Sequence, residues 1–222
     1  MKGTVLMTSL SGAFEEALAL AFAREGWRVY ALGAASPEAV RAGIAPLPEV
    51  PEEAARALAA QAGRIDYYLD TTDARDEADG ATVREGLDGA ATEALYRRNV
   101  LRPMALLEAF LPLLDAGEGK RLFFVSSARA CINETRDTAH YGYNMSKAAL
   151  HQFLQMVRNR LAPAGYTLRA YDPLRGEVPP ALAAEGALHY ALRRRGTENN
   201  DPRRDDETHL VLRDALGRQH AW

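Results

Sequence analysis

Short apolar runs alternate with longer amphipathic runs along almost the whole chain, and this alternation limits the possible folds more than any other feature. Residues 4–8 (TVLMT) and 65–70 (IDYYLD) have the aliphatic and aromatic content of buried strands. Residues 51–63 (PEEAARALAAQAG) begin with a proline and end with a glycine, as helices commonly do. Repeated strand–helix–strand units form a parallel sheet covered by helices. The sequence therefore predicts a single α/β domain with a doubly wound parallel sheet.

The remaining elements are expected in the same alternating order. Further strands are expected at residues 27–33, 121–127, 166–173 and 209–214, with a weaker one at 44–48, and further helices at residues 14–25, 37–42, 92–114 and 146–162. Pro103 lies inside the helix expected at 92–114 and predicts a kink or a late start. The acids at the end of the strand expected at 65–70 and just after it lack an ordered calcium-loop pattern and are interpreted as a solvated loop. They are Asp70, Asp73, Asp76, Glu77 and Asp79.

Composition excludes several classes of partner. The net charge is −3 with acids and bases interspersed, so neither nucleic acid nor a membrane surface meets a basic patch, and a small-molecule partner is expected. The first ten residues have no signal-peptide core, and no run of eighteen apolar residues follows, so the chain is expected to be cytoplasmic. Cys131 is the one cysteine and is expected to be a buried or half-buried thiol. The histidines show no zinc spacing, so no metal site is expected.

Tyr143 and Lys147, in the run YNMSK, carry the strongest chemical signal. Lysine is rare here, because the chain has three lysines against twenty-four arginines. On a helix, the spacing of four residues places both side chains on one face. A fixed ammonium group there favours the ionised phenol and lowers its pKa, which suits a tyrosine for proton transfer near neutral pH. The pair therefore predicts a proton-transfer site at the entrance of a helix.

Asn99 in RRNVLRPM and Ser127 in FFVSSARA precede this run, and with them the chain resembles the short-chain dehydrogenase/reductase family over nearly its whole length. The resemblance implies a Rossmann-like fold and a catalytic tetrad of Asn99, Ser127, Tyr143 and Lys147. Tyr143 would be the general acid/base in carbonyl/alcohol interconversion, and Lys147 would lower its pKa and hold the nicotinamide ribose. Ser127 would bind the substrate oxygen, and Asn99 would hold a relay water. The interval between Ser127 and Tyr143 is longer than usual, which leaves Ser126 as an alternative.

The cofactor motif of the family is degenerate in this chain. Its glycine-rich turn, TGxxxGxG, lets the backbone approach a pyrophosphate at a helix N-terminus, and Ser9, Ala13 and Glu15 stand at the three glycine positions. Glu15 adds bulk and negative charge, although an acid in a first helical turn is also stabilised by the helix dipole. Leu174 follows Pro173 where the family commonly has glycine. Where the family has NNAG, this chain has Asp70, Thr71, Thr72 and Asp73.

The resemblance nevertheless implies a nicotinamide cofactor. The end of the second strand has neither an acid for a ribose diol nor an arginine for a 2′-phosphate, so NAD and NADP both stay open. Glu49 stands where an acid near the adenine is expected. The residues expected to bind the cofactor are Thr8, Ser9, Ser11, Gly12, Phe14, Glu49 and Lys147.

Two functions therefore compete. One is an NAD(P)-dependent short-chain oxidoreductase; the other is a non-catalytic protein of the same fold, a ligand sensor or an interaction subunit without dinucleotide binding. The resemblance implies a homodimer or homotetramer, and it implies that residues 177–208 form a substrate lid and mobile loop. The apolar residues on the two helices that would form such an interface fit a core position equally well. They are Leu106, Phe110, Leu113, Leu150, Phe153, Leu154 and Val157.

Overall fold

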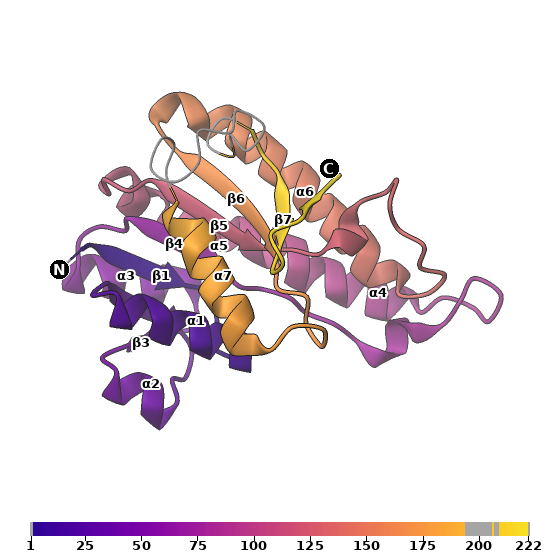
Figure 1. The fold of residues 1–222 in the computed structure, drawn as a ribbon, viewed down its shortest axis with the longest axis horizontal. Helices are drawn as coiled ribbons and strands as arrows, with labels where there is room; N and C mark the ends of the chain where they lie inside the picture. The colour runs from indigo at the N-terminus through magenta and orange to yellow at the C-terminus, as the bar shows by residue number, and fades with distance from the viewer. Residues whose placement is uncertain (1, 194–205, 207–208, 222) are drawn as a thin grey trace.

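A central sheet organises the chain in the computed structural model, which describes residues 2–193, 206 and 209–221 (Figure 1). Within these residues, eight strands follow the order β3-β2-β1-β4-β5-β6-β7-β8, and all neighbours are parallel except β7 and β8. The doubly wound parallel sheet predicted from the sequence is confirmed. The strands are β1 (Thr4–Met7), β2 (Arg28–Leu32), β3 (Ala45–Leu47), β4 (Tyr67–Asp70), β5 (Arg121–Val125), β6 (Thr167–Asp172), β7 (Leu212–Asp214) and β8 (Gln219–His220).

Helices cover both faces of the sheet. On one face, α1 (Ala13–Arg24) packs against α7 (Pro180–Leu192), with α2 (Pro37–Arg41) beside α1 (Figure 1). The other face carries α3 (Pro51–Gln61), α4 (Gly89–Tyr96), α5 (Arg102–Asp115) and α6 (Tyr141–Leu161). The short helical turns are η1 (Glu77–Gly80), η2 (Arg97–Leu101), η3 (Ala128–Ala130) and η4 (Ala162–Ala164).

Strand residues alternate between two hydrophobic clusters, because successive side chains of a strand point to opposite faces. On β5, Phe123 packs in the cluster under α1 and α7, whereas Leu122 and Phe124 pack in the cluster under α3, α5 and α6. The strands in the middle of the sheet are buried on both sides, and β1 (TVLM) and β5 (RLFFV) are apolar after their first residue. This double burial explains the apolar runs that predict these strands from the sequence.

Several element boundaries differ from the sequence-based expectation. The helix expected at residues 92–114 begins at Gly89 and continues through α4, the π-helical η2 and α5. Pro103 stands in the first turn of α5, and the late start that it predicted is wrong, because helical residues precede it. The last parallel strand, β7, is shorter than residues 209–214, and β8 was not expected.

The expected lid, residues 177–208, coincides in part with a core element. Its described helix, α7, crosses from β6 to β7 and buries Ala183 and Ala187 against α1. Residues 194–205 and 207–208 of this segment lie outside the described residues, so the lid and mobile loop stay a prediction.

The apolar residues of α5 and α6 pack inside the subunit. Leu106, Phe110, Leu150 and Leu154 are buried in the cluster under α3, α5 and α6, and Leu113, Phe153 and Val157 pack partly buried against it. A homo-oligomer therefore stays a prediction without support from these residues. Among the described helices, none combines the length and apolar character required to cross a membrane.

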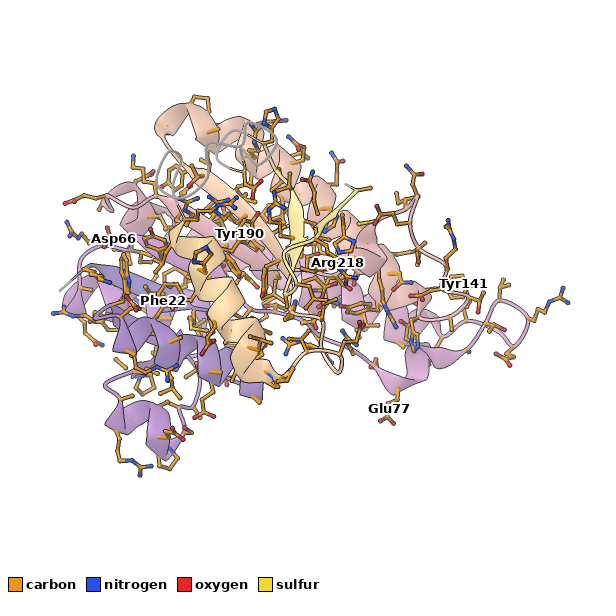
Figure 2. The ribbon with its side chains drawn as sticks, in the orientation of Figure 1. Phe22, Asp66, Glu77, Tyr141, Tyr190 and Arg218 are labelled. Atoms are coloured by element: carbon orange, nitrogen blue, oxygen red, sulfur yellow. The ribbon has the colours of Figure 1, made fainter. Side chains whose placement is uncertain are left out.

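A buried carboxylate joins segments at the amino ends of the strands. Asp66 accepts hydrogen bonds from the backbone N–H groups of Thr4 (2.8 Å), Glu118 (2.9 Å) and Gly119 (3.3 Å). A Cβ atom at Gly119 would lie 2.5 Å from the carbonyl oxygen of Asp66, so this close approach requires glycine. Asp66 and Tyr141 lie toward opposite ends of the molecule (Figure 2), so Asp66 serves the scaffold.

Replacing Asp66 by alanine should destabilise the fold, because three backbone N–H groups lose a charged acceptor. We expect the free energy of unfolding to fall by about 3 kcal/mol, measured by urea denaturation. The matched control is Glu118→Ala, which removes an exposed ion pair to Arg64 (2.7 Å) at the same site and should cost less than about 1 kcal/mol. Equal losses for the two variants would contradict the anchoring role of Asp66.

Candidate active site

A cavity of about 490 Å³ opens at the carboxyl ends of the strands. This is the edge where open α/β sheets bind ligands, and the sheet order reverses its direction there between β1 and β4. The cavity is lined by the β1–α1 turn, the loop after β4, the helical segment from η2 to the start of α5, and the segment after β6. The lining residues are Ser9, Ser11, Gly12, Glu15, Thr71, Thr72, Asp73, Ala74, Arg75, Arg98, Arg102 and Arg175.

Asp79 positions the helix that carries the predicted catalytic pair. Its two carboxylate oxygens accept hydrogen bonds from the N–H groups of Gly142 (2.7 Å) and Tyr143 (2.8 Å), at the first turn of α6. An acid in this place satisfies free N–H groups and is stabilised by the helix dipole. At Gly142, a Cβ atom would lie 2.9 Å from the Cα atom of Thr92, so α4 and α6 approach closely here. The backbone of Tyr143 is therefore held rigidly.

Tyr143 and Lys147 converge on one carboxylate, that of Asp73. The Tyr143 hydroxyl donates a hydrogen bond to Asp73 Oδ1 (2.7 Å), and Lys147 Nζ forms an ion pair with the same oxygen (3.2 Å). Lys147 Nζ also donates to the carbonyl oxygens of Thr72 (2.9 Å) and Val125 (3.3 Å). The side chains of Lys147 and Asp73 are 0% and 3% exposed, so this group of charges is shielded from water.

The acids after β4 were expected in a solvated loop, and that expectation is wrong for three of the five, whereas Asp76 is half-exposed and Glu77 is exposed. Asp70 and Asp79 are buried, and the Asp73 side chain is almost fully covered. Each has specific partners: Asp70 accepts from the Thr72 N–H (2.9 Å) and the Tyr68 hydroxyl (3.2 Å). Among the described residues, no cluster of His, Cys, Asp and Glu side chains is arranged to hold a metal ion.

The protonation of Tyr143 is also opposite to the expectation. Burial raises its pKa well above the ordinary value, and the negative charge of Asp73 raises it further, while Arg75, stacked over the ring at 4.9 Å, opposes the shift. Lys147 does not lower the pKa as predicted, because Asp73 is paired with Lys147 and accepts a hydrogen bond from the phenol. Tyr143 is therefore a neutral phenol, which is the form that can donate a proton.

The carboxyl group of Asp73 has the reverse shift. Burial favours its neutral form, but the charges of Lys147 and Arg175, the hydrogen bond from Tyr143 and the charge of Arg75 together outweigh burial and lower the pKa to about 2. Asp73 is thus an anion throughout the neutral range.

Asn99 and the two serines have distinct contacts. Asn99, in η2, accepts from the Ala74 N–H (2.8 Å) and donates to the Ala74 carbonyl oxygen (2.9 Å) and to Ser146 Oγ (3.0 Å). It therefore fixes the loop after β4 against α6, and its role with a relay water stays a prediction. Ser126 Oγ forms a hydrogen bond with His151 Nε2 (2.8 Å) in the interior. Ser127 Oγ accepts from the Arg129 N–H (3.3 Å), and Ser127 lies close enough to Tyr143 to lower the pKa of its phenol, so Ser127 stays the predicted site serine.

The residues predicted to bind the cofactor are only partly brought together. Ser9, Ser11 and Gly12 line the cavity. Thr8 instead ties β1 to the loop after β4 by accepting from the Thr71 N–H (3.1 Å), and Phe14 is buried in the core. Glu49 lies beside Gly33 and Lys147 lies behind Asp73, and neither lines the cavity.

Four arginines in the cavity lining were missed from sequence: Arg75, Arg98, Arg102 and Arg175. The four guanidinium groups and the two carboxylates of Glu15 and Asp73 give the described lining a net charge of +2. Arg102, for example, donates to the Thr8 carbonyl oxygen and to Thr72 Oγ1, both at 3.3 Å. No short motif marks these arginines, because they come from three separate segments. The volume and the charge fit an anionic small molecule such as a nucleotide.

Arg175 connects the two carboxylates. Its Nε atom donates to Asp73 Oδ2 (2.7 Å), and its terminal nitrogen binds Glu15 Oε1. The preceding residue, Leu174, has φ of 50°, a left-handed conformation that favours glycine and that turns the chain toward the cavity. We call the ion pairs of Glu15, Arg175 and Asp73 the Arg175 bridge.

Comparisons with known proteins agree with this fold. No family model matches the chain. An uncharacterized oxidoreductase of Myxococcus xanthus is 30% identical over 197 residues, which cover 82% of this chain and 74% of that protein. A short-chain dehydrogenase/reductase-type structure from Burkholderia multivorans with bound NADP superimposes over 100% of both chains with a TM-score of 0.81, at 22% identity. The chain belongs to the short-chain dehydrogenase/reductase family.

Other relatives match a smaller part. An uncharacterized oxidoreductase of Saccharomyces cerevisiae is 32% identical over 95 residues, which are 43% of this chain and 36% of that protein. The chain thus spans about a third of the length of this yeast relative. The catalytic tetrad of Asn99, Ser127, Tyr143 and Lys147 and the altered cofactor turn stay predictions from the sequence.

The depressed pKa of Asp73 should make stability depend on pH in the acid range. The carboxyl group titrates at about 2 in the folded chain and ordinarily at 3.8, so the unfolded chain binds more protons between these values. The stabilisation is fully present above about pH 4 and is lost as pH falls toward about 2, and it amounts to about 2 kcal/mol. Urea denaturation across this pH range should therefore show a steeper loss of stability for the wild type than for Asp73→Asn. Parallel pH profiles would contradict the ion pairing of Asp73.

Proposed function

We propose that this short-chain dehydrogenase/reductase is an NAD(P)-dependent oxidoreductase that reduces a carbonyl group, with Tyr143 as the general acid. The observation that carries the proposal is the position of Tyr143 between two cavities. Its hydroxyl meets Asp73 in the arginine-lined cavity, and Tyr143 itself lines a second cavity of about 460 Å³. Figure 2 labels Glu77 and Tyr141, whose segments border this second cavity. Its lining residues are Arg75, Asp76, Glu77, Asp79, Arg129, His140 and Tyr143.

The two cavities suit different ligands. The arginine-lined cavity has a net positive charge and suits the phosphates of a dinucleotide. The second cavity has mixed charge and an ionisable phenol in its wall, and it suits the carbonyl substrate. NAD and NADP contain the same diphosphate, so the charge of the first cavity leaves both possible.

The chain's own residues would perform the proton chemistry. A bound nicotinamide would supply the hydride. The neutral Tyr143 would donate its proton to the carbonyl oxygen of a substrate in the second cavity, and the Ser127 hydroxyl beside it would hydrogen-bond the same oxygen. Lys147, buried on the same face of α6, would stabilise the resulting phenolate. The raised pKa keeps Tyr143 protonated near neutral pH, so the phenol carries the proton that carbonyl reduction consumes.

The non-catalytic alternative rests on a separate observation. Asp73 already binds both Tyr143 and Lys147, and Glu15 stands at the first turn of α1, where the family holds a diphosphate. A ligand sensor of this fold would tolerate such changes. It would bind a ligand without turnover, or fail to bind dinucleotides altogether. Calorimetric titration with NADH and NADPH separates these possibilities, because no binding at millimolar cofactor would reject the enzyme.

Tyr143→Phe should remove turnover and retain cofactor binding. The variant keeps the buried ring but loses the proton donor, so kcat should fall by about 10²- to 10⁴-fold while the cofactor Kd changes little. Turnover is followed by nicotinamide absorbance with a panel of aldehydes and ketones. The matched control is Tyr141→Phe, which removes the phenol of the first residue of α6 and should keep wild-type turnover. Unchanged kcat in Tyr143→Phe would reject Tyr143 as the general acid.

A further inference from the structure

The Arg175 bridge spans the arginine-lined cavity. Glu15 comes from the first turn of α1, Asp73 from the loop after β4, and Arg175 from the segment after β6. The side chains of Glu15 and Asp73 are 5% and 3% exposed, and that of Arg175 is 26% exposed. Three segments that are distant in sequence are therefore joined across the cavity by two ion pairs.

The bridge lies where a nucleotide would have to enter. The crevice between β1 and β4 is the position at which open α/β sheets take up ligands, and the N-terminus of α1 at its side favours an anion. Glu15 supplies a carboxylate at this helix end, folded so closely over Gly12 that a Cβ atom there would collide with Glu15 Oε2. The carboxylates of Glu15 and Asp73 thus occupy a cavity whose arginines would otherwise attract the anion of a ligand.

One atom of the bridge is unsatisfied. Glu15 is 4% exposed, and its Oε2 atom has no hydrogen-bond partner among the described residues. A buried carboxylate oxygen without a donor is costly, and such exceptions in a folded protein call for an explanation. A bridge that served stability alone would be expected to satisfy both oxygens. The unsatisfied oxygen is consistent with an arrangement that changes when a ligand enters.

We propose that the Arg175 bridge is an autoinhibitory contact that sets the affinity of the cavity for nicotinamide dinucleotides, an inference that rests on the proposed function. The diphosphate of the ligand displaces Glu15 and Asp73 from Arg175 and takes over the guanidinium. Because the same Asp73 carboxylate accepts the hydrogen bond of the Tyr143 hydroxyl, opening the bridge also releases the phenol for the substrate. Cofactor binding and release of the Tyr143 phenol are therefore coupled through Asp73. The fraction of molecules in which the Arg175 bridge is broken limits the apparent affinity for the dinucleotide.

A purely structural bridge makes a different prediction. If the bridge only stabilised the site, loss of any of its members would leave a partner unpaired and would weaken ligand binding. If the bridge competes with the ligand, loss of a carboxylate must strengthen binding and loss of the arginine must weaken it. The signs of the three effects therefore distinguish the two roles.

The test is calorimetric titration of the wild type and of three variants with NADPH and NADH. Asp73→Asn and Glu15→Gln should each bind the cofactor at least about tenfold more tightly, whereas Arg175→Gln should bind at least about tenfold more weakly. Asp73→Gly, which removes the side chain completely, is a second variant at this position and should also bind more tightly. Thermal unfolding of each variant confirms that the protein titrated is folded.

The control has the same change of charge at the other edge of the sheet. Glu118 precedes β5 at the amino ends of the strands and its side chain is 80% exposed, so Glu118→Gln should leave the cofactor Kd within about twofold of the wild type. If the wild type binds cofactor and neither Asp73→Asn nor Glu15→Gln binds more tightly, the autoinhibitory role is rejected and the proposed function stands. If neither the wild type nor any variant binds, both are rejected.

Discussion

The carboxylate of Asp73 is the centre on which the arrangement of the site depends. It accepts a hydrogen bond from the Tyr143 hydroxyl and forms ion pairs with Lys147 on one side and Arg175 on the other. A buried carboxylate is stable only when cations and donors compensate the loss of hydration. Here Tyr143 and Lys147 of α6 and Arg175 after β6 compensate the lost hydration of Asp73. This one carboxylate, in the loop after β4, therefore holds α6 and the segment after β6 together. Burial raises the pKa of Tyr143, and the same anion raises it further.

Two other buried acids organise the scaffold around this centre. Asp66 binds backbone N–H groups at the amino ends of the strands, and Asp79 binds those of the first turn of α6. Charged acceptors form stronger hydrogen bonds to N–H groups than neutral ones do. Asp66 thus anchors the segment that leads into β4, and Asp79 anchors the beginning of α6. The position of Tyr143 relative to Asp73 is therefore a property of the whole fold.

The altered cofactor turn and the arginines belong together. A glycine-rich turn binds phosphates through backbone N–H groups, and in this chain Glu15 takes the space over Gly12. Arginine side chains around the same cavity restore a positive charge from other segments. A guanidinium can bind a phosphate through two parallel hydrogen bonds. Arginine side chains can therefore replace the backbone N–H donors of a glycine-rich turn without preserving its sequence motif. The membership of the family is thus compatible with a different way of holding its ligand.

The sequence by itself determined the α/β class, the order of strands and helices, and the spacing that places Tyr143 and Lys147 on one face of α6. These features are local, because hydrophobic periodicity, helix-end residues and the i,i+4 spacing act within a few turns of the chain. Only the tertiary structure decided that Asp73 is buried between Lys147, Tyr143 and Arg175, and that four arginines line the cavity. Asp73 and Arg175 are 102 residues apart, and no local pattern encodes such a contact. The charge of the site, and with it the protonation of Tyr143, arises from side chains that the folded sheet brings together.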